Sequence, residues 1–160
     1  MSGETNVSPD ISLRPPHSQI TDVLVPTDGK TPVYPGFELV APLFETARST
    51  IHTLHVETPE AGEESFVRYT PSKGAERKVT SLTERFAELG FETKAHVARG
   101  EPAQEIAKVA TAMAVDMIVM VTTHANTLLS KSTTQTVISV VDIPVVTIHA
   151  ESVRGATERP

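Results

Sequence analysis

The 160-residue chain contains no cysteine and no tryptophan, and aromatic residues make up only 4% of it. The lack of cysteine excludes disulfide bonds, thiolate catalysis and zinc sites built on cysteine. No apolar run approaches the roughly 20 residues that a membrane span requires. With so few aromatic rings, we expect a core made mainly of Val, Ile, Leu, Ala and Met side chains.

Positive charge is also scarce, because 14 Lys and Arg residues stand against 20 Asp and Glu residues and leave a net charge of −6. Nucleic acids and anionic membrane surfaces attract proteins with a positive patch. We therefore expect neither nucleic acid nor membrane as a partner. Residues 1–19 are polar and lack a charged start followed by an apolar stretch. This pattern predicts no signal peptide, and hence a cytoplasmic location.

Composition predicts one folded domain between two flexible tails. Residues 1–19 hold three prolines and show no apolar periodicity, and residues 151–160 are similarly polar. Such segments bury too little apolar surface to fold. The remaining residues, 20–150, are of ordinary size for a single domain and contain no internal repeat.

Five short apolar runs predict β-strands. Two of them, at 117–121 and 144–148, are almost continuously apolar, which is typical of strands buried on both faces of a parallel sheet. The five predicted strands are Ile20–Pro26, Ile51–Val56, Phe91–Val97, Met117–Val121 and Pro144–His149.

Helical patterns separate these runs. Leu39, Val40, Leu43, Phe44 and Ala47 mark a first apolar face, which Pro42 should kink. The other predicted faces are Ala75, Val79, Leu82, Phe86 and Leu89, closed by Gly90, and Ala103, Ile106, Val109, Ala110 and Met113, with Pro102 in the first turn.

The segment Thr133–Val141 is rich in β-branched residues, which by propensity favour a strand. We predict a helix there because two consecutive parallel strands need a crossover between them. The result is an α/β fold: a single doubly wound domain with a five-stranded parallel sheet and helices on both faces. In such sheets, ligands bind beyond the carboxyl ends of the strands, where the strand order reverses.

The first predicted strand ends in Pro26-Thr27-Asp28-Gly29, which places a carboxylate at that edge. An Asp-Gly pair is also a common turn former, and the local sequence alone favours that role. The two roles predict different costs of replacement. If Asp28 serves mainly as a ligand contact, Asp28→Ala should change stability by no more than about 1 kcal/mol.

The chain as a whole resembles the universal stress protein family. Five pieces carry the resemblance, in order and at the family's spacing. They are residues 23–29 (Val-Leu-Val-Pro-Thr-Asp-Gly), 54–56 (Leu-His-Val), 100–103 (Gly-Glu-Pro-Ala), 116–120 (Asp-Met-Ile-Val-Met) and 143–146 (Ile-Pro-Val-Val). The resemblance implies a five-stranded parallel sheet, a homodimer, and roles in stress survival and signalling rather than a known reaction.

One branch of that family binds ATP and another does not. In the binding branch, the position matching Asp28 contacts the adenine or its surroundings, and those matching Pro26, Thr27, Val56 and Met120 line the pocket. The phosphates lie in a loop of pattern Gly-x2-Gly-x9-Gly-[Ser/Thr] after the fourth strand. The resemblance therefore gives eight candidate nucleotide-contacting residues: Pro26, Thr27, Asp28, Val56, Met120, Val121, Lys131 and Ser132.

This chain departs from the family pattern in the phosphate loop. Val121, His124 and Lys131 stand at the positions of the three glycines, the loop is three residues short, and only Ser132 keeps the family's hydroxyl. A phosphate cradle needs glycine where the backbone turns to a positive φ or approaches the anion closely. We therefore expect no resident cofactor and no tight binding of ATP. Lys131 and Ser132 leave room for weak binding of ATP, AMP or a smaller anion.

Three functions remain in competition. The first is a dimeric stress-response or regulatory protein that acts through a protein partner, with the last strand, Ile143–His149, at the dimer interface as in the family. The second is an ATP- or AMP-binding switch of the same family. The third, an enzyme of another doubly wound family, ranks last because no nucleophile motif, acid–base pair or metal cluster supports it. His52 and His55 lie three residues apart on a strand and face opposite sides, so they predict no metal site.

Overall fold

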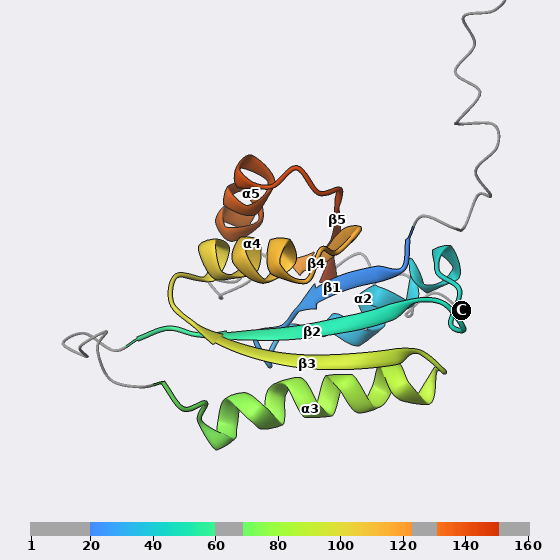
Figure 1. Ribbon diagram of the computed structural model, residues 1–160, viewed down its shortest axis with the longest axis horizontal. Coiled ribbons are helices and arrows are strands. Elements are labelled where there is room, and N and C mark those ends of the chain that lie inside the picture. Colours follow the sequence, from blue (N-terminus) through green and yellow to red (C-terminus); the bar gives the residue numbers. More distant parts are fainter. Residues whose placement is uncertain (1–19, 60–68, 123–130, 151–160) are drawn as a thin grey trace, which may run out of the picture.

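The computed structural model describes residues 20–59, 69–122 and 131–150, so the two predicted tails lie outside the described residues. Five strands form one sheet in the order β3-β2-β1-β4-β5, and every neighbouring pair is parallel (Figure 1). The predicted five-stranded parallel sheet is therefore confirmed. The strands are β1 (Asp22–Pro26), β2 (Thr50–Glu57), β3 (Glu92–Arg99), β4 (Met117–Thr122) and β5 (Val145–His149).

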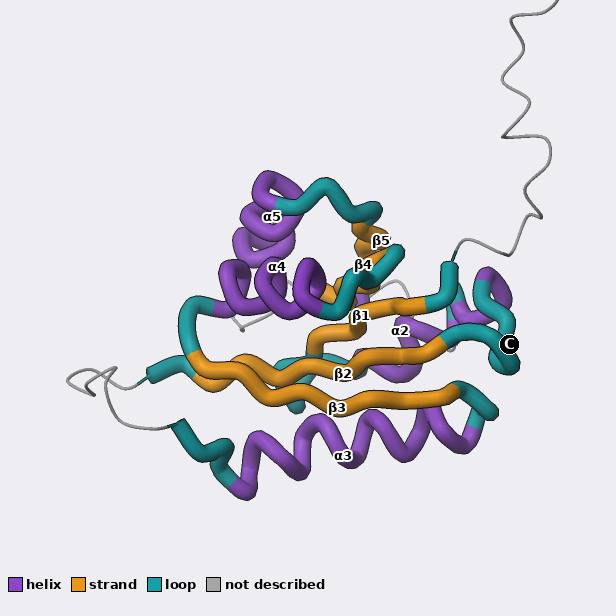
Figure 2. Tube along the Cα trace, viewed as in Figure 1, coloured by secondary structure: helices purple, strands orange, loops and turns teal. Residues whose placement is uncertain are grey.

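Helices cover both faces of the sheet (Figure 2). The helical elements are α2 (Val33–Glu38), the short 3₁₀ helix η2 (Ala41–Leu43), α3 (Lys73–Glu88), α4 (Pro102–Ala112) and α5 (Lys131–Val140). Helix α3 lies against β2 and β3 on one face, while α4 and α5 lie on the other (Figure 1). Helix α2 shares the face of α3, because the ring centroids of Phe37 and Phe86 are 4.6 Å apart.

The strand order places a switch point at the centre of the sheet. The chain moves outward from β1 to β2 and β3, then returns to lay β4 on the other side of β1. The strand order therefore reverses between β1 and β4, and in sheets of this kind ligands bind beyond the carboxyl ends of the strands at that point. This is the edge at which the sequence places its candidate site residues.

The first predicted helix is wrong in its position and its buried face. The chain instead forms the six-residue α2, which buries Val33 and Phe37, and then the separate η2. Leu39 and Leu43 are 55% and 53% exposed. Pro42 accounts for the separate element, because it has no N–H to continue the helical hydrogen bonds of α2 and instead lies in the first turn of η2.

The other helices occur where the sequence predicts them. Ser72 caps α3 by accepting a 3.0 Å hydrogen bond from Ala75 N. Its predicted stripe is buried except for Leu89, which lies just beyond the helix and is exposed. The β-branched segment 131–140 is helical, and hydroxyl groups within it bond to the backbone one turn earlier, as from Thr136 Oγ1 to Ser132 O at 3.0 Å. The crossover requirement therefore outweighs local propensity there.

Candidate functional site

The predicted site residues lie along the carboxyl edge of three adjacent strands. Pro26 ends β1, and Thr27 and Asp28 follow it. Val56 is the penultimate residue of β2, and Met120 and Val121 lie close to the end of β4. All six are buried. The structure therefore gathers them at one edge, where most serve as walls rather than as exposed contact groups.

The loop after β1 is held together by the Asp28 carboxylate, which is only 3% exposed. Its Oδ1 accepts hydrogen bonds from Lys30 N at 2.8 Å and Thr31 N at 2.6 Å. Its Oδ2 accepts one from Thr31 Oγ1 at 2.8 Å. Gly29 lies between them with a φ of 78°, a conformation that favours glycine. These contacts are those of a turn-forming aspartate, and the predicted ligand contact of Asp28 stays a prediction.

Thr27 connects this loop to the sheet. Its backbone N donates to Leu54 O at 2.8 Å, and its carbonyl oxygen accepts from His55 Nδ1 at 2.9 Å. Its hydroxyl accepts from Gly29 N at 3.0 Å. Among the residues that the structure describes, nothing accepts the hydroxyl's own proton, although the residue is only 6% exposed. A buried donor without an acceptor is uncommon in folded proteins.

The end of β4 is closely packed against α2. A Cβ atom placed on Gly36 would lie 2.8 Å and 3.0 Å from the two γ-methyl carbons of Val121, so the helix approaches that side chain as only glycine allows. Val121 is fully buried inside a regular strand. It therefore lies in extended backbone, and its two methyl groups pack against α2.

The rest of the candidate phosphate loop, residues 123–130 with His124, lies outside the described residues. The chain resumes at Lys131, which begins α5, and Ser132 is an exposed residue of its first turn. These two candidates thus mark the start of the helix that follows the loop.

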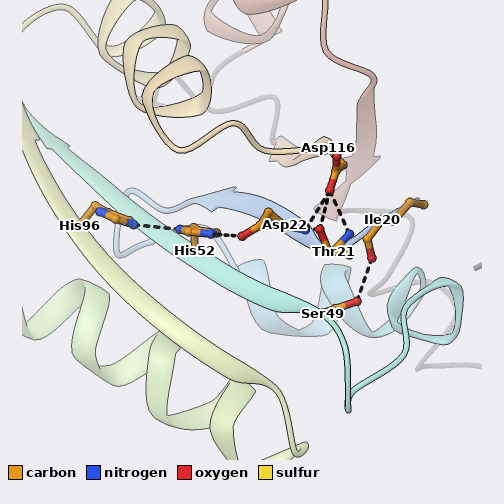
Figure 3. Close-up of polar contacts among 7 residues, drawn as sticks. All are labelled: Ile20, Thr21, Asp22, Ser49, His52, His96 and Asp116. Atoms are coloured by element: carbon orange, nitrogen blue, oxygen red, sulfur yellow. Dashed lines mark hydrogen bonds and ion pairs between the residues drawn. The ribbon is translucent and has the colours of Figure 1, made fainter. Parts of the chain in front are cut away.

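The opposite, amino edge of the sheet carries a polar network that the sequence analysis missed (Figure 3). Asp116 Oδ2 accepts hydrogen bonds from Thr21 N at 2.9 Å, Asp22 N at 3.0 Å and Thr21 Oγ1 at 3.1 Å. His52 Nε2 lies 2.8 Å from Asp22 Oδ1, and its Nδ1 lies 3.0 Å from His96 Nε2. We call Asp22, His52 and His96 the histidine chain.

The two rings of the histidine chain are stacked, with centroids 5.3 Å apart and planes inclined by 15°. Burial lowers the pKa of His96 from its ordinary value, and the charges of His52 and Lys94 lower it further. The alternation of strands could have suggested this chain, because residues two apart on a strand share a face. His52 lies two residues beyond Thr50, the partner of Asp22, and His96 lies two residues beyond Lys94, the partner of His52. The sequence alone did not give the register that aligns them.

The histidines do not form a metal centre in the described part of the chain, which holds no group of three His, Asp or Glu side chains able to bind an ion. As predicted, His52 and His55 face opposite sides of β2, one bonding within the histidine chain and the other to Thr27 O. None of the helices in residues 20–59, 69–122 and 131–150 combines the length and apolar character that a membrane crossing needs.

The sheet order, the switch point and the residues at the carboxyl edge all agree with the sequence resemblance. A model of the universal stress protein family matches residues 19–149. The chain belongs to the universal stress protein family. Among curated protein sequences, none matches it.

Solved universal stress proteins share its fold. The UspA protein from Lactobacillus plantarum is 18% identical, with a TM-score of 0.63 over 82% of this chain and 99% of that one. A universal stress protein in complex with cAMP is 14% identical, with a TM-score of 0.61 over 83% and 99%. One from Archaeoglobus fulgidus in complex with dAMP is 17% identical, with a TM-score of 0.58 over 81% and 98%.

Proposed function

We propose that this universal stress protein is a dimeric regulatory protein that acts through a protein partner and does not bind ATP tightly. The observation that carries the proposal is the packing of Val121 against Gly36 at the end of β4. This packing puts a buried, branched side chain at the position where the ATP-binding branch of the family has the first glycine of its phosphate loop, which supports weak binding of ATP. No glycine follows up to Ser132, so the backbone lacks the residues that best converge their N–H groups on a phosphate.

Titration calorimetry with Mg-ATP tests the binding half of this proposal. We expect a dissociation constant weaker than about 10 μM, which corresponds to a binding free energy smaller than roughly 7 kcal/mol in magnitude. Mass spectrometry of a denatured extract should find no stoichiometric nucleotide in the purified protein. A tighter constant, or one ATP per subunit after purification, would contradict the proposal.

The dimer half of the proposal concerns β5, which lies at the edge of the sheet. Its Val145 and Val146 are only partly buried within one subunit. A partly apolar edge strand invites pairing with another chain unless a partner covers it. Light scattering at micromolar protein should give a dimer, and Val146→Lys should give a monomer that keeps its far-UV circular dichroism. A monomeric parent protein would refute this assembly.

A nucleotide switch of the same family is the second candidate. It is favoured by the solved universal stress proteins whose complexes contain cAMP and dAMP. Both ligands carry a single phosphate, which needs fewer hydrogen-bond donors from the shortened loop than a triphosphate does. Calorimetry with AMP and cAMP separates the two candidates. A dissociation constant tighter than about 10 μM for either ligand supports the switch. Weaker binding of both ligands supports the partner-binding protein.

A further inference from the structure

A hollow lies beside the loop that follows β1, between α2 and α3. It encloses about 310 Å³, which is at the lower end of the range of small-molecule sites. The loop and the start of α2 form one wall, and one stripe of α3 forms the other. The stripe consists of Lys78, Ser81, Leu82 and Arg85, which the spacing of a helix places on one face. We call this hollow the α2–α3 pocket.

Lys78 and Arg85 are held in place by the opposite wall. A Cβ atom on Gly29 would lie 2.6 to 2.8 Å from the Cγ, Cδ and Cε atoms of Lys78, so the absence of a side chain at Gly29 makes room for the lysine stem. The Arg85 guanidinium carbon lies 3.9 Å from the centre of the Tyr34 ring. Such stacking orients a guanidinium while leaving its N–H groups available to an anion.

The charge of the α2–α3 pocket is opposite in sign to that of the whole protein. Its lining includes Lys78 and Arg85 and no carboxylate. Neither cation has an ion pair with any residue that the structure describes. Burial, and then Glu38 and Glu88, raise the pKa of the Tyr34 hydroxyl, while Arg85 acts to lower it. The buried Asp28 carboxylate lies behind the lining and accepts the hydroxyl proton of Thr31. Two cations without an ion pair in the described part of the chain therefore share one hollow, although the net charge of the protein is −6.

The polar side chains of the lining add a donor. Thr31 already donates its hydroxyl proton to Asp28, whereas the buried Thr27 hydroxyl has no acceptor among the described residues. Thr27 lines the pocket together with apolar groups from Pro32, Val33 and Leu82. A ligand acceptor here would satisfy a buried donor that the protein itself leaves unpaired.

We infer that the α2–α3 pocket binds a small organic oxyanion, a carboxylate or a phosphate monoester on a compact apolar body. The oxyanion lies between Lys78 and Arg85, which supply charge-assisted hydrogen bonds. The apolar body lies against Tyr34 and Leu82. This pocket lies between α2 and α3, whereas the candidate residues of the proposed function lie at the ends of β1, β2 and β4, and only Thr27 belongs to both sets.

Backbone ¹⁵N–¹H spectra test the inference. Phenyl phosphate and benzoate are titrated separately at constant ionic strength, with benzyl alcohol as the uncharged probe. We expect saturable shifts of the Gly29, Thr31 and Ser81 amides, with a dissociation constant below about 1 mM for at least one anion. Benzyl alcohol should bind at least about tenfold more weakly. The absence of saturable shifts up to about 10 mM for both anions would overturn the inference.

Two double variants separate the pocket from a general attraction between charges. Lys78→Met with Arg85→Gln should raise the dissociation constant of the anion at least about tenfold. Lys73→Met with Arg77→Gln removes the same charge from α3 outside the lining and should change the constant by less than about twofold. Equal weakening in both variants, or none in either, would overturn the inference. Circular dichroism checks that each variant is folded. We expect both to fold, because Lys73, Arg77 and Arg85 are exposed and Lys78 is only partly buried.

Discussion

The two edges of the sheet differ in how their polar side chains are paired. At the amino edge, Asp22, His52 and His96 bond to one another. At the carboxyl edge, among the described residues, the Thr27 hydroxyl has no acceptor for its proton and Lys78 has no ion pair. Both edges bury polar groups, but at the first edge the buried His52 ring has both of its nitrogen atoms hydrogen-bonded within the protein. The difference indicates where this protein uses polar side chains to fold and where it leaves them available to a ligand. Each prediction below tests one side of that contrast.

The largest loss of stability is expected from His52→Ala. The ring is 2% exposed, and its removal takes away the hydrogen-bond partner of Asp22 Oδ1 and of His96 Nε2 and opens a cavity. We expect the free energy of unfolding, measured by urea denaturation, to fall by about 3 kcal/mol. At the other edge, Thr27→Val should lower it by less than about 1 kcal/mol. Equal losses would remove the contrast between the two edges.

Asp28→Ala should have the next largest effect. The three hydrogen bonds that its carboxylate accepts hold the loop after β1, so we expect a loss of about 2 kcal/mol in urea denaturation. Asp28→Asn keeps one oxygen acceptor for the backbone N–H groups and should lose less. A loss below about 1 kcal/mol for Asp28→Ala would instead favour the ligand-contact role that the family resemblance implies.

Gly36→Ala tests the packing that closes the end of β4. The added methyl would meet the γ-methyl groups of Val121, and this overpacking outweighs the gain in helix propensity. We expect a loss of about 1 kcal/mol in the free energy of unfolding. In a Val121→Ala background, the same change should be neutral or stabilising. If the two substitutions are additive, the side chains do not interlock.

The pH dependence of stability should give the smallest effect, because it rests on one half-buried ring. The folded-state pKa of His96 is below its ordinary value of 6.5, so the folded chain binds its proton less readily than the unfolded chain. The stability contributed by the neutral ring is present above pH 6.5 and is lost as the pH falls through 6.5 towards the lower folded-state pKa. Asp22, His52 and Lys94 are the charged or titratable groups beside it.

Thermal melts between about pH 8 and pH 5 measure this loss. The His96→Gln variant is the control, because its amide keeps a polar group at that position but takes up no proton in this range. Its melting temperature should fall less on acidification than that of the parent protein. An identical dependence in both proteins would show that other groups account for the acid sensitivity.

The sheet was predictable because its signals are continuous. The almost uninterrupted apolar residues of β4 and β5 indicate strands buried on both faces, and the parallel order follows from the helical segments between strands. Even α5 was found by topology against its own β-branched residues. The first helix was not predictable in detail. The apolar spacing continues past Pro42 and indicates one helix, whereas the proline indicates a break, and the spacing alone does not show which of the two prevails.

The site was predictable only to the level of the edge. The family motif located Pro26, Thr27 and Asp28, but the hydrogen bonds of Asp28 depend on the conformation of the loop. The α2–α3 pocket joins Gly29 and Tyr34 to residues about fifty positions later, and no local pattern links them. The histidine chain likewise depends on strand register, which only the folded sheet defines.

The histidine chain also fixes where protons are. A carboxylate can only accept, so while both rings are neutral the His52 Nε2 carries the hydrogen and donates it to Asp22. The His52 Nδ1 is then bare and accepts, and His96 must hold its hydrogen on Nε2. One carboxylate on β1 thereby selects the tautomer of an imidazole two strands away. The His96 Nδ1 lone pair, at the outer strand of the sheet, is the basic end of that relay.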